Sequence, residues 1–176
     1  FACCAHLRGC EPRGALLAEV QCNGLPVYFL TTHLGVGPAE RSAQMANFLG
    51  KQWLGSLDLA SPMAVCGDFN MMRGTVAYRA LAARLHDAQL ACPNARPRMT
   101  FPAAFPFSRI DHVFVSAHFK VHHVSVPRND LTRLASDHLP LIADLAVSGP
   151  PHRHALAPSG QSPASQTGLL VPAPRP

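Results

Sequence analysis

Short apolar runs alternate with helical patterns along residues 1–147, and this alternation limits the fold more than any other feature of the sequence. Runs rich in β-branched and aromatic residues indicate β-strands. They cover Ala15–Val20, Pro26–Thr31, Met63–Cys66, Ile110–Ser116, Val121–Val126 and Leu139–Val147. With 48% hydrophobic residues in 176, the chain has enough apolar side chains for one core. We therefore expect one mixed α/β (α+β) domain.

Two helices are predicted between these runs. The first begins near Pro38, a residue suited to a first helical position. Spacings of three and four define its apolar stripe, which is Met45, Phe48, Leu49 and Trp53. Arg41, Gln44 and Lys51 are then expected to face water. A second helix over residues 75–85 is expected to direct Val76, Leu81 and Leu85 into the core, with Arg79 and Arg84 outside.

Polar side chains stand at the ends of four apolar runs. The junctions read Thr32-His33-Leu34, Gly67-Asp68-Phe69-Asn70, Arg109-Ile110-Asp111-His112 and Ser136-Asp137-His138-Leu139-Pro140. Each alone has an ordinary explanation, such as a half-buried imidazole for His33 or a turn cap for Asp68 or Asp137. Four of them in one short chain indicate a ligand-binding edge of the sheet, since loops there are held by rigid strands.

Strand alternation predicts a partner for Asp111. Successive side chains of a strand point to opposite faces, so Asp111 shares a face with Val113 and Val115 while His112 points away. A carboxylate beside valines needs a partner from another segment. The candidates are His138 and His33, either of which would form a carboxylate–imidazole pair.

The polar residues at the junctions suit phosphoryl chemistry. They comprise three carboxylates, an amide and two imidazoles: Asp68, Asp111, Asp137, Asn70, His33 and His138. Carboxylate and amide oxygens suit a hard divalent cation, and imidazoles supply acid–base groups. The sequence contains no Gly-rich phosphate loop ending in Lys-Ser/Thr, no Gly-x-Ser-x-Gly and no His-Glu-x-x-His. The central parts of a nucleoside triphosphatase, an α/β-hydrolase and a zinc protease are therefore absent from it.

The order of these four motifs resembles the endonuclease/exonuclease/phosphatase superfamily, which includes deoxyribonuclease I, apurinic endonucleases, sphingomyelinases and inositol-polyphosphate phosphatases. The match runs from about Arg13 to Leu145, and residues 38–44 resemble the helix after the family's Thr-His-Leu motif. The resemblance implies a deoxyribonuclease I-like two-sheet β-sandwich flanked by helices, with the site at its top.

The resemblance also implies roles, motif by motif. His33 would contact the scissile phosphate or act on the leaving group, and Asp68 would activate or orient the water. Asn70 would hold a phosphate oxygen. Asp111 would orient His138, which would serve as general base or phosphate ligand. The metal, Mg²⁺ or Mn²⁺, would be bound by Asp137, Asp68 and Asn70.

The sequence departs from the family upstream of His33. The family's main metal ligand is a Glu before the Thr-His-Leu motif, and here only Glu11 and Glu19 precede His33, neither in a similar motif. Glu19 is expected to be an exposed strand residue. We therefore expect residues 1–147 to be the C-terminal part of such a domain, truncated so that a metal ligand and N-terminal strands are missing.

Two functions remain open from the sequence. The first is a Mg²⁺- or Mn²⁺-dependent phosphoesterase that hydrolyses a phosphodiester, in DNA, in RNA, or in a small or lipid molecule. The alternative is a catalytically incompetent domain that at most binds phosphate or a partner. Arg96, Arg98 and Arg109 can contact a phosphate, although a solvated loop is the commoner setting for such residues. Without a Lys/Arg-rich run interleaved with aromatics, a lipid head group stays a candidate beside nucleic acid.

Composition bears on partners and compartment. The net charge of +5, with 13 Arg and only Lys51 and Lys120, tolerates a phosphate-bearing partner. Sparse cysteines favour free thiols in the cytoplasm, and the crowded Cys3, Cys4, His6 and Cys10 match no zinc pattern. His122 and His123 are expected at the surface. No apolar run is long enough to cross a membrane. We expect the protein to be a monomer. The Pro-rich residues 148–176 are expected to be disordered.

Overall fold

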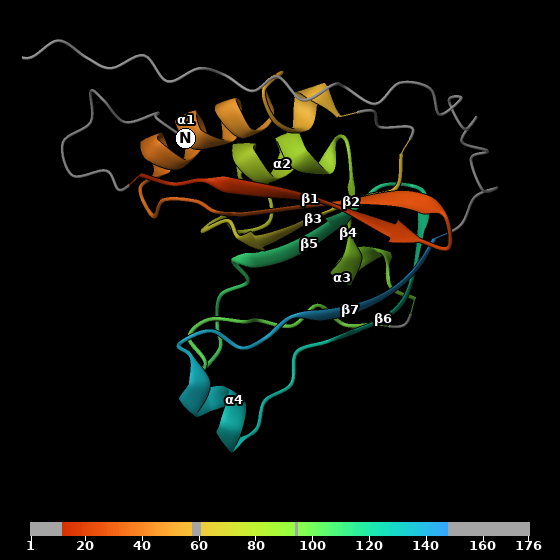
Figure 1. Ribbon diagram of the computed structural model, residues 1–176. Helices are drawn as coiled ribbons and strands as arrows, with labels where there is room; N and C mark the ends of the chain where they lie inside the picture. The colour runs from red at the N-terminus through yellow and green to blue at the C-terminus, as the bar shows by residue number, and fades with distance from the viewer. Residues whose placement is uncertain (1–11, 58–60, 94, 148–176) are drawn as a thin grey trace, which may run out of the picture.

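The computed structural model describes residues 12–57, 61–93 and 95–147 as a mixed α/β fold with two sheets (Figure 1). The predicted disorder of residues 148–176 and the cysteines of residues 3–10 lie outside the described residues. The larger sheet lies between two helices on one face and the smaller sheet on the other. Within the described part of the chain, no helix is both long and apolar enough to cross a membrane.

The larger sheet has five strands in the order β1-β2-β3-β5-β4. Their bounds are β1 Ala15–Cys22, β2 Leu25–His33, β3 Met63–Asp68, β4 His86–Asp87 and β5 Asp111–Val115. β2 and β3 are parallel, whereas β5 is antiparallel to β3. The end of β2, the end of β3 and the beginning of β5 therefore meet at one edge, where His33 pairs with Asp68 and Asp68 with Asp111.

The smaller sheet consists of β6 Phe119–Ser125 and β7 Ile142–Val147, which are antiparallel with a bulge between Val121 and His123. Its apolar residues pack against the larger sheet in a cluster that includes Ala64, Val115 and Val121. His122 and His123 are both exposed, so their predicted surface position is confirmed. Glu19 on β1 is exposed as predicted.

Helices α1 Pro38–Phe48 and α2 Val76–Ala82 cover the opposite face of the larger sheet (Figure 1). The core between them contains Leu30, Phe48, Phe69, Leu81 and Phe114. The short helices are η1 Leu54–Ser56, α3 Ala88–Ala91 and α4 Asp130–Ala135. Of these, α4 has no buried residue and leads directly into the Ser136-Asp137-His138 motif.

Two helix predictions were wrong in side-chain placement. Gln44, expected in water, is fully buried because its Oε1 accepts a hydrogen bond from the Gly35 N–H at 2.7 Å and its Nε2 donates to Glu40. It thereby ties α1 to the loop after β2. Val76, expected in the core, is exposed because α2 begins at that residue, after the Thr75 cap, and buries Ala77 and Tyr78 instead.

Candidate active site

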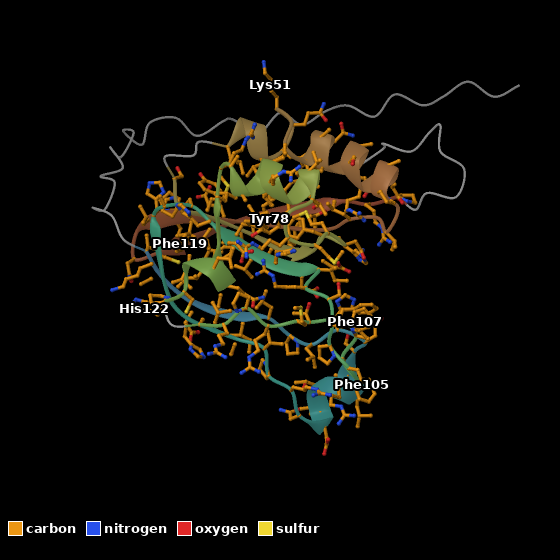
Figure 2. All side chains as sticks on the ribbon, turned by 180° about the vertical axis from the view of Figure 1, so that it is seen from behind. Lys51, Tyr78, Phe105, Phe107, Phe119 and His122 are labelled. Atoms are coloured by element: carbon orange, nitrogen blue, oxygen red, sulfur yellow. The ribbon has the colours of Figure 1, made fainter. Side chains whose placement is uncertain are left out.

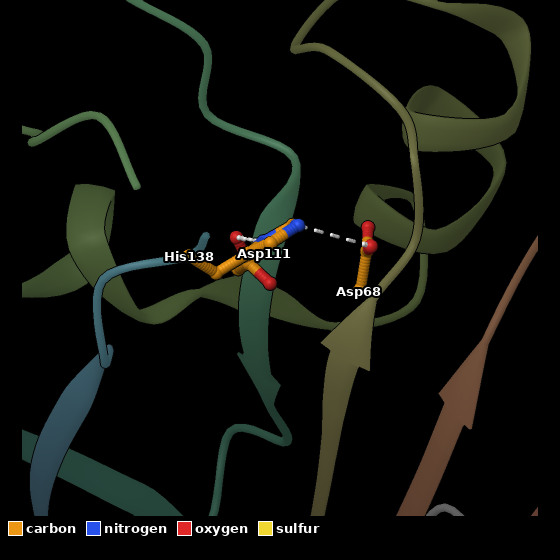
Figure 3. Close-up of side chains that lie close together, drawn as sticks. All are labelled: Asp68, Asp111 and His138. Atoms are coloured by element: carbon orange, nitrogen blue, oxygen red, sulfur yellow. Dashed lines mark hydrogen bonds and ion pairs between the residues drawn. The ribbon is translucent and has the colours of Figure 1, made fainter. Parts of the chain in front are cut away.

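Four of the predicted site residues meet at the sheet edge described above. His33 ends β2, Asp68 ends β3 and Asp111 begins β5. His138 reaches them from the loop between α4 and β7 (Figure 3). Asp68, Asp111 and His138 also form one wall of an open pocket of about 420 Å³, whose other walls include Thr132, Ala135 and Val113.

His138 lies between two carboxylates. Its Nδ1 is 2.8 Å from Asp111 Oδ2 and its Nε2 is 3.8 Å from Asp68 Oδ2 (Figure 3). The predicted pairing of Asp111 with a histidine from another segment is thus confirmed. Because a carboxylate only accepts hydrogen bonds, Nδ1 carries the proton and donates it to Asp111. In neutral His138 the Nε2 lone pair is then free to accept a proton beside Asp68.

The loop around His138 is fixed from its far side. The Phe101 ring lies against the imidazole, with centroids 4.7 Å apart. The backbone N–H of Leu139 donates to the Thr100 carbonyl at 2.7 Å, and that of Ala103 donates to the Asp137 carbonyl at 2.6 Å. These contacts bracket His138 and limit the rotation of its ring.

His33 and Asn70 surround Asp68 on its other side. Arg13 Nη1 lies 3.2 Å from His33 Nδ1, and since a guanidinium only donates, Nδ1 must accept. His33 Nε2 then carries the proton and points at Asp68 Oδ2, 3.3 Å away. Asn70 donates its backbone N–H to Asp68 Oδ1 at 2.8 Å and its side-chain amide to the Leu34 carbonyl at 2.8 Å. The first two junction motifs are thereby held together around one carboxylate.

The turn that carries Asp68 requires unusual backbone angles. Asn70 has φ of 49°, a left-handed conformation that Asn tolerates better than most residues. Gly67 has φ of 144°, and a Cβ at this position would lie 1.9 Å from the Thr32 carbonyl oxygen. Glycine is required there because β3 passes so close to β2.

Gly67→Ala is expected to destabilise the fold by about 2 kcal/mol or more, through a strained φ and the contact with Thr32. Urea unfolding measures the change. Gly14→Ala is the matched control, because a Cβ at Gly14 meets no atom within 4 Å. Equal unfolding midpoints for the two variants would contradict the prediction.

The carboxylates and the imidazole shift one another's titration. Burial raises the pKa of Asp68, and the charge of Asp111 adds to this, outweighing the hydrogen bond from Asn70 and the imidazoles of His33 and His138. Burial alone lowers the pKa of His138, but the hydrogen bond to Asp111 and the charges of Asp111, Asp68 and Asp137 raise it overall. A cluster of this kind favours cationic groups and is typical of functional sites.

The same three residues can hold a cation. One ligand atom from each of Asp68, Asp111 and His138 lies within 4.8 Å of the others. Two carboxylates and an imidazole fit a divalent ion such as Mn²⁺ or Mg²⁺, with water or substrate oxygens completing its coordination. Asp137, predicted as a metal ligand, is exposed and is not in this group, and Asp111 is there instead. The catalytic and metal-binding roles of the individual residues stay predictions.

Behind the site lies a buried polar network that the sequence analysis did not predict. Arg109 donates to both oxygens of Asp87, at 3.1 and 2.5 Å, and Tyr78 donates to Asp87 Oδ2 at 2.7 Å. Arg109 is buried, so the expectation of a solvated loop for it was wrong. Buried His112 contacts the Met71 carbonyl through Nε2 at 2.8 Å, and its Nδ1 is 3.7 Å from Asp87. The network anchors the start of β5, from which Asp111 projects.

The comparisons identify the family. The model of the Endonuclease/Exonuclease/phosphatase family matches residues 6–138, so the chain belongs to this family. The uncharacterized protein YbhP of Escherichia coli K12 is 30% identical over 139 residues, which make up 78% of this chain and 54% of YbhP. The chain therefore spans about half the length of the curated relatives it matches.

Solved structures agree with this assignment. A mannosyl-6-phosphatase from Bacteroides thetaiotaomicron is 25% identical with a TM-score of 0.65, over 77% of this chain and 57% of that one. A family member from Beutenbergia cavernae is 27% identical with a TM-score of 0.62, over 78% and 40% of the two chains. The catalytic domain of human nocturnin, solved with bound sulfate, is 24% identical with a TM-score of 0.61, over 77% and 53%, and shares the fold. The predicted deoxyribonuclease I-like architecture is confirmed.

Proposed function

We propose that the protein is a divalent-metal-dependent phosphoesterase that hydrolyses a phosphodiester by attack of water. Family membership supports a hydrolase of the phosphoesterase or nuclease kind. The observation that carries the finer proposal is the position of His138, whose Nδ1 is bound to Asp111 and whose Nε2 is directed at Asp68. This arrangement holds a proton acceptor of defined tautomer next to a second carboxylate.

In this proposal each residue has a separate role. Asp111 holds His138 in the tautomer that leaves Nε2 free, and Asp68 orients the attacking water between Nε2 and the phosphate. With substrate bound, the His33 Nε2–H, which points at Asp68 in the free protein, and the second Asn70 amide N–H would donate to the non-bridging oxygens, where negative charge grows in the transition state. The family generally uses divalent metals. An ion bound to the Asp68 carboxylate, and not to the imidazole, would supply further positive charge for the phosphate oxygens while Nε2 of His138 stays free.

Hydrolysis assays test this proposal. We expect the chain to release product from a chromogenic phosphodiester when Mn²⁺ or Mg²⁺ is added, and to lose this activity with a chelator. A chromogenic monoester and plasmid DNA are assayed in parallel. Turnover of the monoester alone would indicate that the protein is a phosphatase and not a phosphodiesterase. A folded chain silent on all three substrates would favour the alternative, an incompetent domain that binds phosphate or a partner.

Metal binding is a separate prediction that needs no turnover. We expect Asp68→Asn to weaken Mn²⁺ binding by about 10- to 100-fold, because it removes one of the two carboxylate charges from the cluster. Isothermal titration or the electron paramagnetic resonance signal of free Mn²⁺ measures this. Asp130→Asn, at an exposed carboxylate on α4 outside the cluster, is the control and should bind as the wild type does. Equal affinity in both variants would contradict the assigned site.

A further inference from the structure

Four large apolar side chains project into solvent near the candidate site. Phe105 is 78% exposed, Phe107 74%, Leu131 76% and Leu134 87%. We call these four residues the apolar tip. Isolated exposed apolar residues are common, whereas several on neighbouring segments mark an interaction surface.

The two segments that carry the apolar tip are tied together. Arg128, just before α4, donates from Nη2 to the Ala104 carbonyl at 2.6 Å, and the Asp137 carbonyl, just after α4, accepts the Ala103 N–H. The loop with Phe105 is therefore fixed at both ends of α4, which carries Leu131 and Leu134. Figure 2 shows Phe105 beside α4, with Phe107 next to it. The apolar tip is thus a single projection of the fold.

The apolar tip adjoins the candidate site directly. The loop that bears Phe105 and Phe107 also bears Phe101, whose ring lies against His138. The Phe107 N–H donates to the Phe101 carbonyl at 3.0 Å. On the other segment, His138 follows α4 in sequence after only Ser136 and Asp137. A surface that receives the apolar tip would bring its own groups close to His138.

Basic side chains flank the apolar tip. Arg128 and Arg133 are exposed on its α4 side, and Arg98 is exposed on the segment that leads into its loop. A hollow shared by Phe107 and Met99 is lined by Arg73 as well. The acidic side chains of these segments are Asp130, which pairs with Arg133 at 3.8 Å, and Asp137. Four arginines against two aspartates give the region a positive charge.

We propose that the apolar tip docks onto an anionic phospholipid surface and that the substrate is a phosphoester presented by that surface. Exposed leucines and phenylalanines gain free energy by entering the acyl boundary of a bilayer, and arginines around them attract anionic head groups. Nucleic acid explains the arginines and phenylalanines, whereas Leu131 and Leu134 offer no aromatic ring on which a base could stack. The substrate part of this inference rests on the proposed phosphoesterase function.

Vesicle flotation with the full chain tests the docking without any need for catalysis. The probes are phosphatidylcholine vesicles with and without phosphatidylglycerol. The test variant is Phe105→Ser with Leu134→Ser, and the matched control is Leu16→Ser with Val76→Ser, at side chains 65% and 72% exposed on β1 and α2. We expect the test variant to bind phosphatidylglycerol vesicles about tenfold or more weakly than the wild type, and the control to bind equally.

The outcomes separate the two proposals. Turnover of a soluble phosphodiester should be the same in all three proteins, because none of the four changed residues contacts the candidate site. Vesicle binding that is absent, or equal in the test variant and the wild type, overturns the docking surface and leaves the phosphoesterase intact. Binding of a single-stranded oligonucleotide that is lost in the test variant, without vesicle binding, overturns it in favour of nucleic acid. Vesicle binding without any turnover overturns the proposed function.

Discussion

His138→Ala is expected to lower kcat for a phosphodiester by about 10²- to 10⁴-fold, the usual contribution of a positioned acid–base group. The imidazole is the group whose Nε2 stands free beside Asp68 while its Nδ1 is held by Asp111. Removing it takes away the imidazole that would accept the proton of the attacking water beside Asp68. Steady-state hydrolysis of a chromogenic phosphodiester in Mn²⁺ measures the loss.

Two further variants make this expectation specific. His122→Ala removes an exposed histidine of β6 and should keep full activity. Asp111→Asn keeps the size of the side chain but lets an amide N–H face His138, which favours the wrong tautomer, so a smaller loss is expected. Activity of His138→Ala within a few-fold of the wild type, with an unchanged unfolding midpoint, would remove His138 from the proposed mechanism.

The meeting of the site residues was predictable from strand chemistry. Polar groups at the ends of apolar runs located His33, Asp68, Asp111 and His138 at one sheet edge, and strand alternation predicted a histidine partner for Asp111 from another segment. The choice between His138 and His33 needed the structure, because it depends on how the loop after α4 folds back onto Phe101. Local pattern specifies which face a side chain occupies, while loop geometry decides which residue it meets.

Other features depend on contacts that no local pattern contains. Gln44 reads as a surface residue of an amphipathic helix, yet it is buried because its amide satisfies a backbone group of the preceding loop. Arg109 and Asp87 are 22 residues apart and form their buried pair only after β4 and β5 align. The one sequence signal was an arginine immediately before a strand, which is equally typical of a solvated loop.

Asp87→Asn is expected to destabilise the protein by about 3–5 kcal/mol, because it leaves Arg109 buried beside an amide in place of a carboxylate. Urea unfolding at neutral pH measures the change. Asp130→Asn breaks an ion pair with Arg133 that lies at the surface, and its unfolding midpoint should stay close to that of the wild type. A similarly small effect of Asp87→Asn would show that the network contributes little to stability.

The pH dependence of the free energy of unfolding tests this prediction in a second, independent way. Burial alone raises the pKa of Asp87, but the close imidazole of His112, the two hydrogen bonds from Arg109 and the Tyr78 hydroxyl hold it well below its usual range. A depressed carboxyl pKa stabilises the fold above the unfolded value of about 4 and loses that contribution as pH falls toward the folded value. The asparagine variant has no such carboxyl to protonate. The difference in free energy of unfolding between wild type and Asp87→Asn should therefore narrow below about pH 4. If this difference instead stays constant as the pH falls below about 4, the charge of Asp87 is not what holds Arg109 in place.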